Sequence, residues 1–199
     1  MDHMHKQNVA AYFDALAADW DGMIKKNDDV IETILDAADI KSGCRVLDLA
    51  CGTGVLFPYY LKRNAGSVVG VDLSLEMTRQ AVKKFPDARV TLLCADAEAL
   101  TIPRAFDRVV LYNALPHFSS PERLFAHAAE FLRDGGRFTV AHGMSRAAIN
   151  ARHMGSAHDV SHGLPSAETI AELFAPHFAV DALRDDEQMY YVTGVKCEA

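Results

Sequence analysis

The sequence lacks several features that would assign it to particular classes of protein. Its 199 residues contain no block of basic side chains, and the formal net charge is −7. An acidic chain of this kind is poorly suited to a phosphate backbone, so we expect no nucleic-acid partner. No apolar run approaches the roughly 18 residues of a membrane span, and the N-terminus lacks the apolar core of a signal peptide. We therefore expect a cytoplasmic protein with no membrane partner.

Cysteine is scarce as well. The four cysteines stand at positions 44, 51, 94 and 197, a spacing that fits neither a zinc module nor a compact disulfide framework. Without an export signal, we expect them to be reduced thiols. The length suffices for one domain with a full hydrophobic core.

Short apolar runs alternate with helical patterns over most of the chain. Strands are predicted at residues 44–50, 67–73, 89–96, 106–113, 137–142, 178–185 and 189–197. Uniformly apolar strands that alternate with helices are typical of a parallel sheet covered on both faces. The short polar turn DEQ before the last run predicts a hairpin, so we expect the C-terminal strand to be antiparallel. The predicted fold is α/β: a Rossmann-like, doubly wound, mostly parallel sheet of seven strands.

The N-terminal region has a helical pattern of its own. Apolar and aromatic side chains recur there at intervals of three or four, at Val9, Tyr12, Phe13, Leu16 and Trp20. A second helix is predicted from Asp28 to Ala38. We expect residues 1–40 to form a helical region that makes one compact unit with the domain of residues 41–199.

A bend rich in small residues follows the first predicted strand, in VLDLACGTG at residues 46–54. Gly52 and Gly54 allow turns that side chains forbid and let the backbone approach a ligand closely. In open α/β sheets, ligands bind beyond the carboxyl ends of the strands. A tight turn without any ligand is the alternative, because short glycine patterns are weak evidence.

Acidic residues occur in phase at three successive strands. Asp72 ends the second, where a carboxylate can accept both hydroxyls of a ribose, and Asp96 ends the third, where one can accept the amine of adenine. With Asp48 they favour a nucleoside ligand, although each alone could be a solvated turn residue. A dinucleotide fingerprint that starts at Gly52 would need glycine or alanine at Phe57, which argues against NAD.

The segments VLDLACGTG, VVGVDLS, CADAEAL and FDRVVLYNALPHF resemble, in order and spacing, the motifs of class I S-adenosylmethionine-dependent methyltransferases. The resemblance covers roughly residues 45–142. It implies S-adenosyl-L-methionine as the cofactor, and it implies a cofactor-binding role for a set of residues. These are Asp48, Ala50, Cys51, Gly52 and Gly54 around the methionine part, Asp72 and Leu73 at the ribose, Asp96 and Ala97 at adenine, and Asn113 near the methyl group. Residues 1–40 would form a lid over the cofactor, to which Tyr12 and Trp20 belong.

One position departs from the family pattern. Ala50 stands where the family has its first motif glycine. Because alanine carries a Cβ, we expect a negative φ at this position and only a small effect on cofactor binding.

Methyl transfer is an in-line displacement, and a general base is needed only when the nucleophile must lose a proton. His117, just past the fourth predicted strand, is the best-placed candidate. A loop histidine that hydrogen-bonds to backbone is the alternative.

Four of the nine histidines lie in one long connection after the fifth predicted strand: His142, His153, His158 and His162. Ser145 can cap a short helix that places Asn150 and His153 on one face. His158 and His162 are four residues apart, a spacing that binds metal when helical. We expect these side chains to line the acceptor site, with a transition-metal site as the alternative.

The predicted function is methyl transfer from S-adenosylmethionine to a small molecule. A non-catalytic sensor or chaperone that binds the cofactor or a metal is one alternative, and a different reaction on the same cofactor is another. The sequence indicates neither the acceptor nor the oligomeric state.

Overall fold

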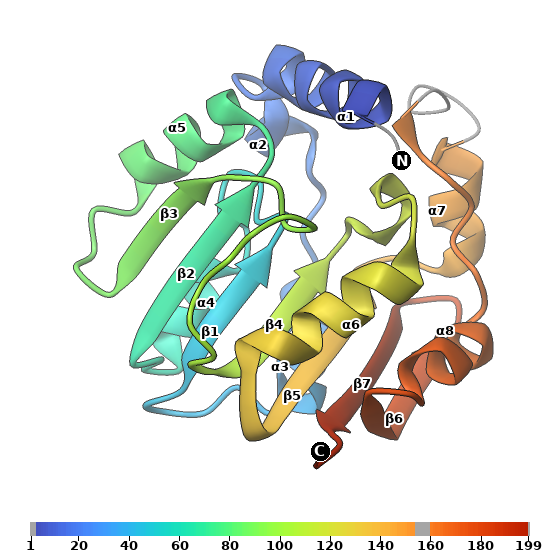
Figure 1. Ribbon diagram of the computed structural model, residues 1–199. Helices are drawn as coiled ribbons and strands as arrows, with labels where there is room; N and C mark the ends of the chain where they lie inside the picture. Colours follow the sequence, from blue (N-terminus) through green and yellow to red (C-terminus); the bar gives the residue numbers. More distant parts are fainter. Residues whose placement is uncertain (1–2, 154–159, 199) are drawn as a thin grey trace.

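The computed structural model describes residues 3–153 and 160–198, which form a seven-stranded sheet with helices on both faces (Figure 1). The strands are β1 (Arg45–Leu49), β2 (Ser67–Asp72), β3 (Val90–Cys94), β4 (Phe106–Tyr112), β5 (Leu132–His142), β6 (Phe178–Asp185) and β7 (Tyr190–Lys196). Their spatial order is β3-β2-β1-β4-β5-β7-β6. Only β7 is antiparallel to its neighbours, β5 and β6. The predicted fold class, with its C-terminal hairpin, is confirmed.

The helices cover the two faces of the sheet and the carboxyl ends of its strands. They are α1 (His3–Leu16), α2 (Trp20–Met23), α3 (Asp28–Ala37), α4 (Phe57–Lys62), α5 (Leu75–Lys84), the 3-10 turn η1 (Leu115–His117), α6 (Pro121–Phe131), α7 (Arg146–His153) and α8 (Ala167–Phe174). In Figure 1, α6 and α8 lie on one face and α3, α4 and α5 on the other. There α1 crosses above the ends of the central strands. Within the described residues, no helix has both the length and the apolar character needed to cross a membrane.

Polar side chains fix where several helices begin. The hydroxyls of Ser74, Ser120 and Ser166 accept hydrogen bonds from backbone N–H groups in the first turns of α5, α6 and α8, at 3.1, 3.4 and 3.3 Å. Such caps satisfy N–H groups that have no partner inside the helix. The start of each helix after its strand is therefore determined locally.

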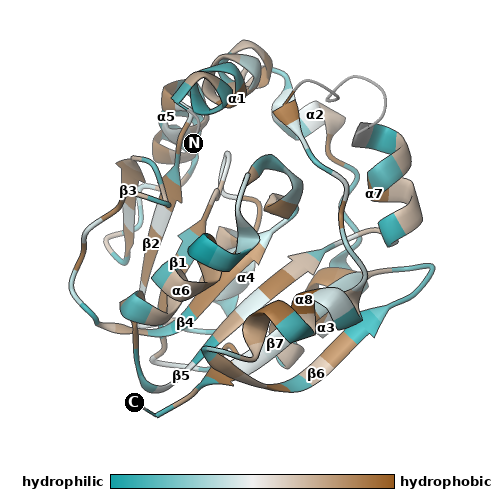
Figure 2. Ribbon diagram, turned by 45° about the vertical axis from the view of Figure 1, so that its right-hand side comes forward, coloured by the Kyte–Doolittle hydropathy of each residue, from teal (hydrophilic) through white to brown (hydrophobic). Residues whose placement is uncertain are grey.

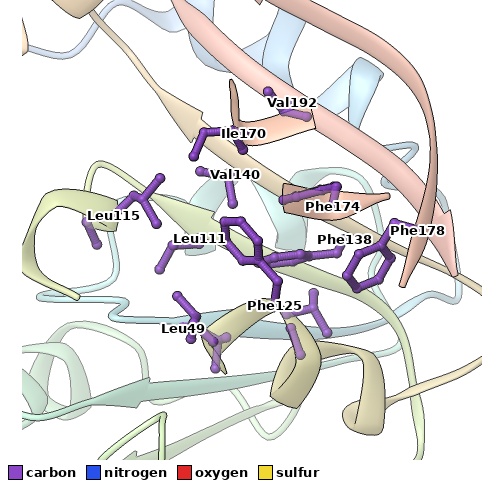
Figure 3. Packing of buried hydrophobic residues seen from close by; sticks show 14 of the residues in the cluster. Leu49, Leu111, Leu115, Phe125, Phe138, Val140, Ile170, Phe174, Phe178 and Val192 are labelled. Carbon is purple, nitrogen blue, oxygen red and sulfur yellow. The ribbon is translucent and has the colours of Figure 1, made fainter. Parts of the chain in front are cut away.

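Two hydrophobic layers hold the sheet. On the α6 and α8 face, Phe138 of β5 stacks on Phe174 at a centroid distance of 5.2 Å, and Phe125 packs against both (Figure 3). On the other face, the fully buried Phe57 and Tyr60 of α4 pack in a second cluster with α3. Apolar positions run along the strands between these layers (Figure 2). Since both faces are covered, the strand ends are left as the open edge of the domain.

Helix α3 belongs to the core. Its Ile34 and Leu35 are fully buried in the second cluster, which also contains strand residues such as Val46. Within the predicted helical region of residues 1–40, only α1 and α2 therefore stay available to cover a site, and these two helices are called the lid below.

Candidate functional site

A cavity of about 450 Å³ lies beneath the lid, at the carboxyl ends of the strands. Its lining includes all the residues that the family resemblance assigns to the cofactor except Gly54: Tyr12, Trp20, Asp48, Ala50, Cys51, Gly52, Asp72, Leu73, Asp96, Ala97 and Asn113. Cavities of this size commonly hold small ligands. The structure thus brings residues from four strand ends and the lid to a single cavity.

The turn after β1, residues 50–54, alternates in handedness and is called the glycine bend. Ala50, Gly52 and Gly54 have φ values of +52°, +55° and +84°. The negative φ expected for Ala50 is wrong. The N–H of Cys51 donates to the carbonyl oxygen of Val71 at 3.1 Å and that of Gly52 to Asp72 Oδ2 at 2.7 Å, so β2 fixes the two residues that follow the left-handed Ala50. A left-handed alanine costs roughly 1–2 kcal/mol, which these bonds offset.

Gly54 does not line the cavity, and its role is in packing. A Cβ at this position would lie 2.7 Å from ring atoms of both Phe57 and Phe85. Glycine is therefore required there by two aromatic rings as well as by its positive φ, and the rings in turn seat α4 behind the bend.

Asp72 is the polar centre of the β2 end. Its Oδ2 accepts from the N–H of Gly52, and its Oδ1 accepts from the N–H of Ser74 at 2.8 Å. Burial raises the pKa of Asp72 to about 6, although the two N–H groups oppose this shift. The side chain is thus ionised at neutral pH. Each carboxylate oxygen has a second lone pair, so Asp72 can accept further hydrogen bonds from a ligand.

Asp48 differs from Asp72 in charge. It is 2% exposed. Burial raises its pKa to about 8; the neighbouring Tyr60 hydroxyl opposes the shift, and the charge of Asp72 adds to it. At pH 7 Asp48 is therefore mostly a neutral carboxylic acid, which can donate as well as accept a hydrogen bond.

Asp96, at the end of β3, is already paired with the lid. Its Oδ2 lies 2.6 Å from Lys6 Nζ of α1, and its Oδ1 accepts from the N–H of Glu98 at 2.9 Å. Lys6 also forms an ion pair of 2.7 Å with the Glu98 carboxylate. A ligand amine that binds Asp96 must share this carboxylate with Lys6.

Two further anchors hold the lid on the loops after β1 and β2. Asp14 of α1 accepts from Ser74 Oγ at 2.5 Å and from the N–H of Glu76 at 3.0 Å, so it caps α5 from outside. Asp21 of α2 accepts from Thr53 Oγ1 at 2.6 Å. Each anchor lies beside one of the three acidic strand ends. Sequence reasoning missed these lid residues, because partners 32 to 90 positions away leave no local signal.

The ends of β4 and β5 form the opposite side of the cavity. Asn113 has a φ of +56°, and its Oδ1 accepts from the N–H of Gly143 at 2.9 Å, which ties the two strand ends together. A Cβ on Gly143 would overlap the hydroxyl of Tyr112. These contacts position Met144 and, beyond it, Ile149 and Arg152 of α7 at the cavity. The part of the cavity lining formed by Tyr112, Asn113, Ala114, Gly143, Met144, Ile149 and Arg152 is called the acceptor wall below.

His117, the last residue of η1, lines the cavity. Its Nδ1 lies 2.8 Å from the carbonyl oxygen of Val160. A carbonyl oxygen only accepts, so Nδ1 carries the proton and Nε2 is the basic nitrogen. The ring of Phe13 from α1 packs edge-on against the imidazole at a centroid distance of 4.9 Å. The lid and the segment at Val160 thus orient this histidine together.

Comparison with known proteins supplies the family. A family model described as a methyltransferase domain matches residues 46–136. The cyclopropane-fatty-acyl-phospholipid synthase of Escherichia coli K12 is 30% identical over 155 residues, which are 76% of this chain and 40% of that protein. The demethylmenaquinone methyltransferase of Renibacterium salmoninarum is 31% identical over 144 residues, 67% of this chain and 57% of that protein. The chain belongs to the class I S-adenosylmethionine-dependent methyltransferases.

The solved structures agree in fold. A chain in the complex of the Haloferax volcanii Trm112 methyltransferase activator with a methyltransferase superposes with a TM-score of 0.81 at 20% identity, over 96% of this chain and 98% of that one. The matches to the two curated relatives cover only about half of their length. Membership of the methyltransferase family supports S-adenosylmethionine as the ligand of the cavity.

The histidine-rich connection of this methyltransferase-family chain differs from the expected acceptor site. His142 is 0% exposed, packs against Tyr190 and is not part of the cavity lining. Asn150 binds the backbone of Leu164, accepting from its N–H at 2.6 Å and donating to its carbonyl oxygen at 3.2 Å. These two residues stabilise the fold around the cavity and do not line it.

The remaining three histidines are His153, His158 and His162. His162 is exposed, with its ring 5.4 Å from that of His5 in the lid. His153 lies in α7, and His158 falls outside the described residues. Over residues 3–153 and 160–198, no group of three or more His, Cys, Asp or Glu side chains could hold a metal ion. The alternative of a transition-metal site has no support from this part of the chain.

Proposed function

We propose that this protein binds S-adenosyl-L-methionine in the cavity and transfers its methyl group to a small-molecule acceptor. The observation that carries the proposal is that Asp48, Asp72, Asp96 and the glycine bend face one cavity under the lid. The cavity of about 450 Å³, closed over by α1 and α2, suits a small acceptor better than a folded macromolecule. The net charge of −7 also disfavours a nucleic acid.

The cofactor roles follow the order of the strand ends. Asp72 and Leu73 would hold the ribose, and Asp96 with Ala97 would bind adenine. The bend from Ala50 to Gly52 would lie against the methionine part, where the neutral acid of Asp48 can donate a hydrogen bond. The path of the bend is fixed, because the N–H groups of Cys51 and Gly52 are bonded to β2.

Asn113, Tyr12 and Trp20 would complete the site. Asn113 lies on the acceptor wall next to the lining from β1 to β3, and its hydrogen bond with the N–H of Gly143 fixes its side chain. Tyr12 and Trp20 are lid aromatics that line the cavity, so they can cover the bound cofactor and exclude water.

When bound, the sulfonium of the cofactor supplies an electrophilic methyl group. The task of the chain is to hold the acceptor atom in line with this methyl group at about 3–3.5 Å. His117 is the proposed base for an acceptor that must lose a proton. Its basic Nε2 follows from the Nδ1 bond to Val160.

The sole tryptophan, Trp20, lines the cavity and provides the test. We expect S-adenosylhomocysteine to change Trp20 fluorescence with a dissociation constant in the micromolar range, and NAD to have no comparable effect. The isolated chain is used, so the experiment also shows whether binding requires a protein activator. Equal or tighter binding of NAD would overturn the proposal.

Turnover separates the enzyme from a non-catalytic binder. Labelled S-adenosylmethionine incubated with a small-molecule extract should yield labelled product with wild-type protein. His117→Gln should reduce this yield and leave S-adenosylhomocysteine affinity within a few-fold. Binding without transfer to any extract fraction would favour a sensor.

A further inference from the structure

Charge is divided between the two sides of the cavity. Its carboxylates all come from the ends of β1 to β3 and the loops after them: Asp48, Asp72, Asp96 and Glu98. On the acceptor wall, Arg152 of α7 is the one charged residue among the described lining residues. Lys25, which follows α2, adds a second cation to the lining. Among the described lining residues, a ligand that rests on the acceptor wall thus meets positive charge and no carboxylate.

Lys25 and Arg152 are also unlike the third lining cation. Lys6 is neutralised by Asp96 and Glu98. Lys25 and Arg152 are exposed, and within the described part of the chain neither forms an ion pair. Arg152 Nη1 instead lies 3.7 Å from the sulfur of Met144, which places the guanidinium over the acceptor wall. In a chain with 27 acidic and 20 basic residues, two such cations at one cavity are available for an anion from outside.

The surfaces next to these cations are apolar. Met144 and Ile149 lie on the acceptor wall near Arg152, and Met23 and Ile24 precede Lys25. An aliphatic or aromatic group would pack on these side chains and displace water from them.

We propose that the acceptor is an amphipathic anion, with an apolar body on the acceptor wall and a carboxylate or phosphate group held by Lys25 and Arg152. This inference rests on the proposed function, because it names the substrate class of the same cavity. Since both cations are exposed, water screens each contact and the selectivity is moderate. We expect the pair together to give about a tenfold preference for an anion.

Three ten-carbon probes test the head group: decanoate, decyl phosphate and decyltrimethylammonium, each below its micelle concentration. They are titrated into protein saturated with S-adenosylhomocysteine, followed by Trp20 fluorescence and calorimetry. We expect both anions to bind about tenfold more tightly than the cation. If decyl phosphate binds more tightly than decanoate, the head group of the acceptor is a phosphate. If the two bind equally, the site recognises the negative charge and does not distinguish a carboxylate from a phosphate.

Variants identify the two cations as the cause. The double variant Lys25→Met, Arg152→Met keeps apolar side chains of similar length and should lose the preference, with S-adenosylhomocysteine affinity within a few-fold. Lys26→Met is the matched control, because Lys26 neighbours Lys25 and does not line this cavity; it should behave as wild type. A cation bound as tightly as decanoate, or a preference retained in the double variant, would overturn the inference. Failure of S-adenosylhomocysteine to bind wild-type protein would instead overturn the proposed function.

Discussion

The two sides of the cavity are built differently. The side over β1 to β3 consists of backbone groups and buried acids that are bonded to one another, as in the bonds from Gly52 and Ser74 to Asp72. The acceptor wall at the ends of β4 and β5 combines apolar side chains with Tyr112, Asn113 and the exposed Arg152. A bonded backbone fixes one ligand shape, whereas side chains on a shared scaffold can be exchanged without disturbing the fold. The difference suits a common cofactor and an acceptor particular to this chain.

The largest expected loss of stability is on the side over β1 to β3, caused by a substitution at Gly54. Gly54→Ala combines a left-handed φ with overlap on Phe57 and Phe85, and we expect it to lower the free energy of unfolding by about 3 kcal/mol. Gly43 is the matched control: its φ is +82°, and a Cβ there meets nothing within 4 Å. Gly43→Ala should cost about 1 kcal/mol. Urea unfolding measures both, and equal losses would show that the rings can move aside.

Asp48→Asn tests whether the buried acid is neutral. The folded-state pKa of about 8 exceeds the ordinary value of 3.8, so the folded protein binds a proton that the unfolded chain releases between these pH values. Stability contributed by this group therefore falls as pH rises from about 4 to 8. Asparagine mimics the neutral acid at every pH. We expect a gain of about 4 kcal/mol at pH 7, larger at pH 8 than at pH 5.

Thermal unfolding across this pH range measures the gain. A variant that is less stable than wild type at pH 8 would indicate an ionised Asp48. The same variant should still bind S-adenosylhomocysteine, because the amide of asparagine can donate a hydrogen bond as the neutral acid does.

Asp72→Asn tests whether the side over β1 to β3 binds the cofactor through the charge of Asp72. Loss of charge-assisted hydrogen bonds to the ribose should weaken S-adenosylhomocysteine binding about ten- to a hundredfold. In wild-type protein the affinity should fall as pH drops below about 6, where Asp72 takes up a proton, and the variant should lack this step. Calorimetry at pH 5 and pH 7.5 measures both effects. The variant Asp87→Asn, at a half-buried carboxylate that does not line the cavity, is the control and should keep the wild-type profile; a wild-type affinity that is independent of pH would contradict the proposed role.

Asp14→Ala has the smallest expected effect, because it loosens one lid anchor of three. The variant loses the bonds to Ser74 and Glu76, so hydrogen exchange in α1 should speed up and S-adenosylhomocysteine affinity should fall a few-fold. Gln7→Ala removes an exposed side chain of the same helix that hydrogen-bonds to His3, and it should change neither. Unchanged exchange in the Asp14 variant would mean that packing alone holds α1.

The sequence was sufficient to predict the fold where the signal is local. Apolar runs located all seven strands, and Ser145 correctly marked the start of α7, because a cap acts within one turn. The φ of Ala50 could not be predicted, since it depends on hydrogen bonds from the bend to β2.

The acceptor side was harder for a related reason. The strand β5 is buried on both faces, so alternation of polar and apolar residues does not tell which way His142 points. Asn150 looked like a ligand residue because its partner, Leu164, lies across a loop. The lid anchors likewise join residues far apart in the chain.

The glycine bend contains a thiol, and its burial has a chemical consequence. Cys51 is 5% exposed, and burial raises its pKa well above the ordinary value. The thiolate, which is the form that reacts with oxidants and alkylating agents, is therefore suppressed. Cys94 and Cys197 are exposed. An alkylating reagent will modify these two sites while the bend stays intact, and labelling of Cys51 will report the moment at which the bend opens.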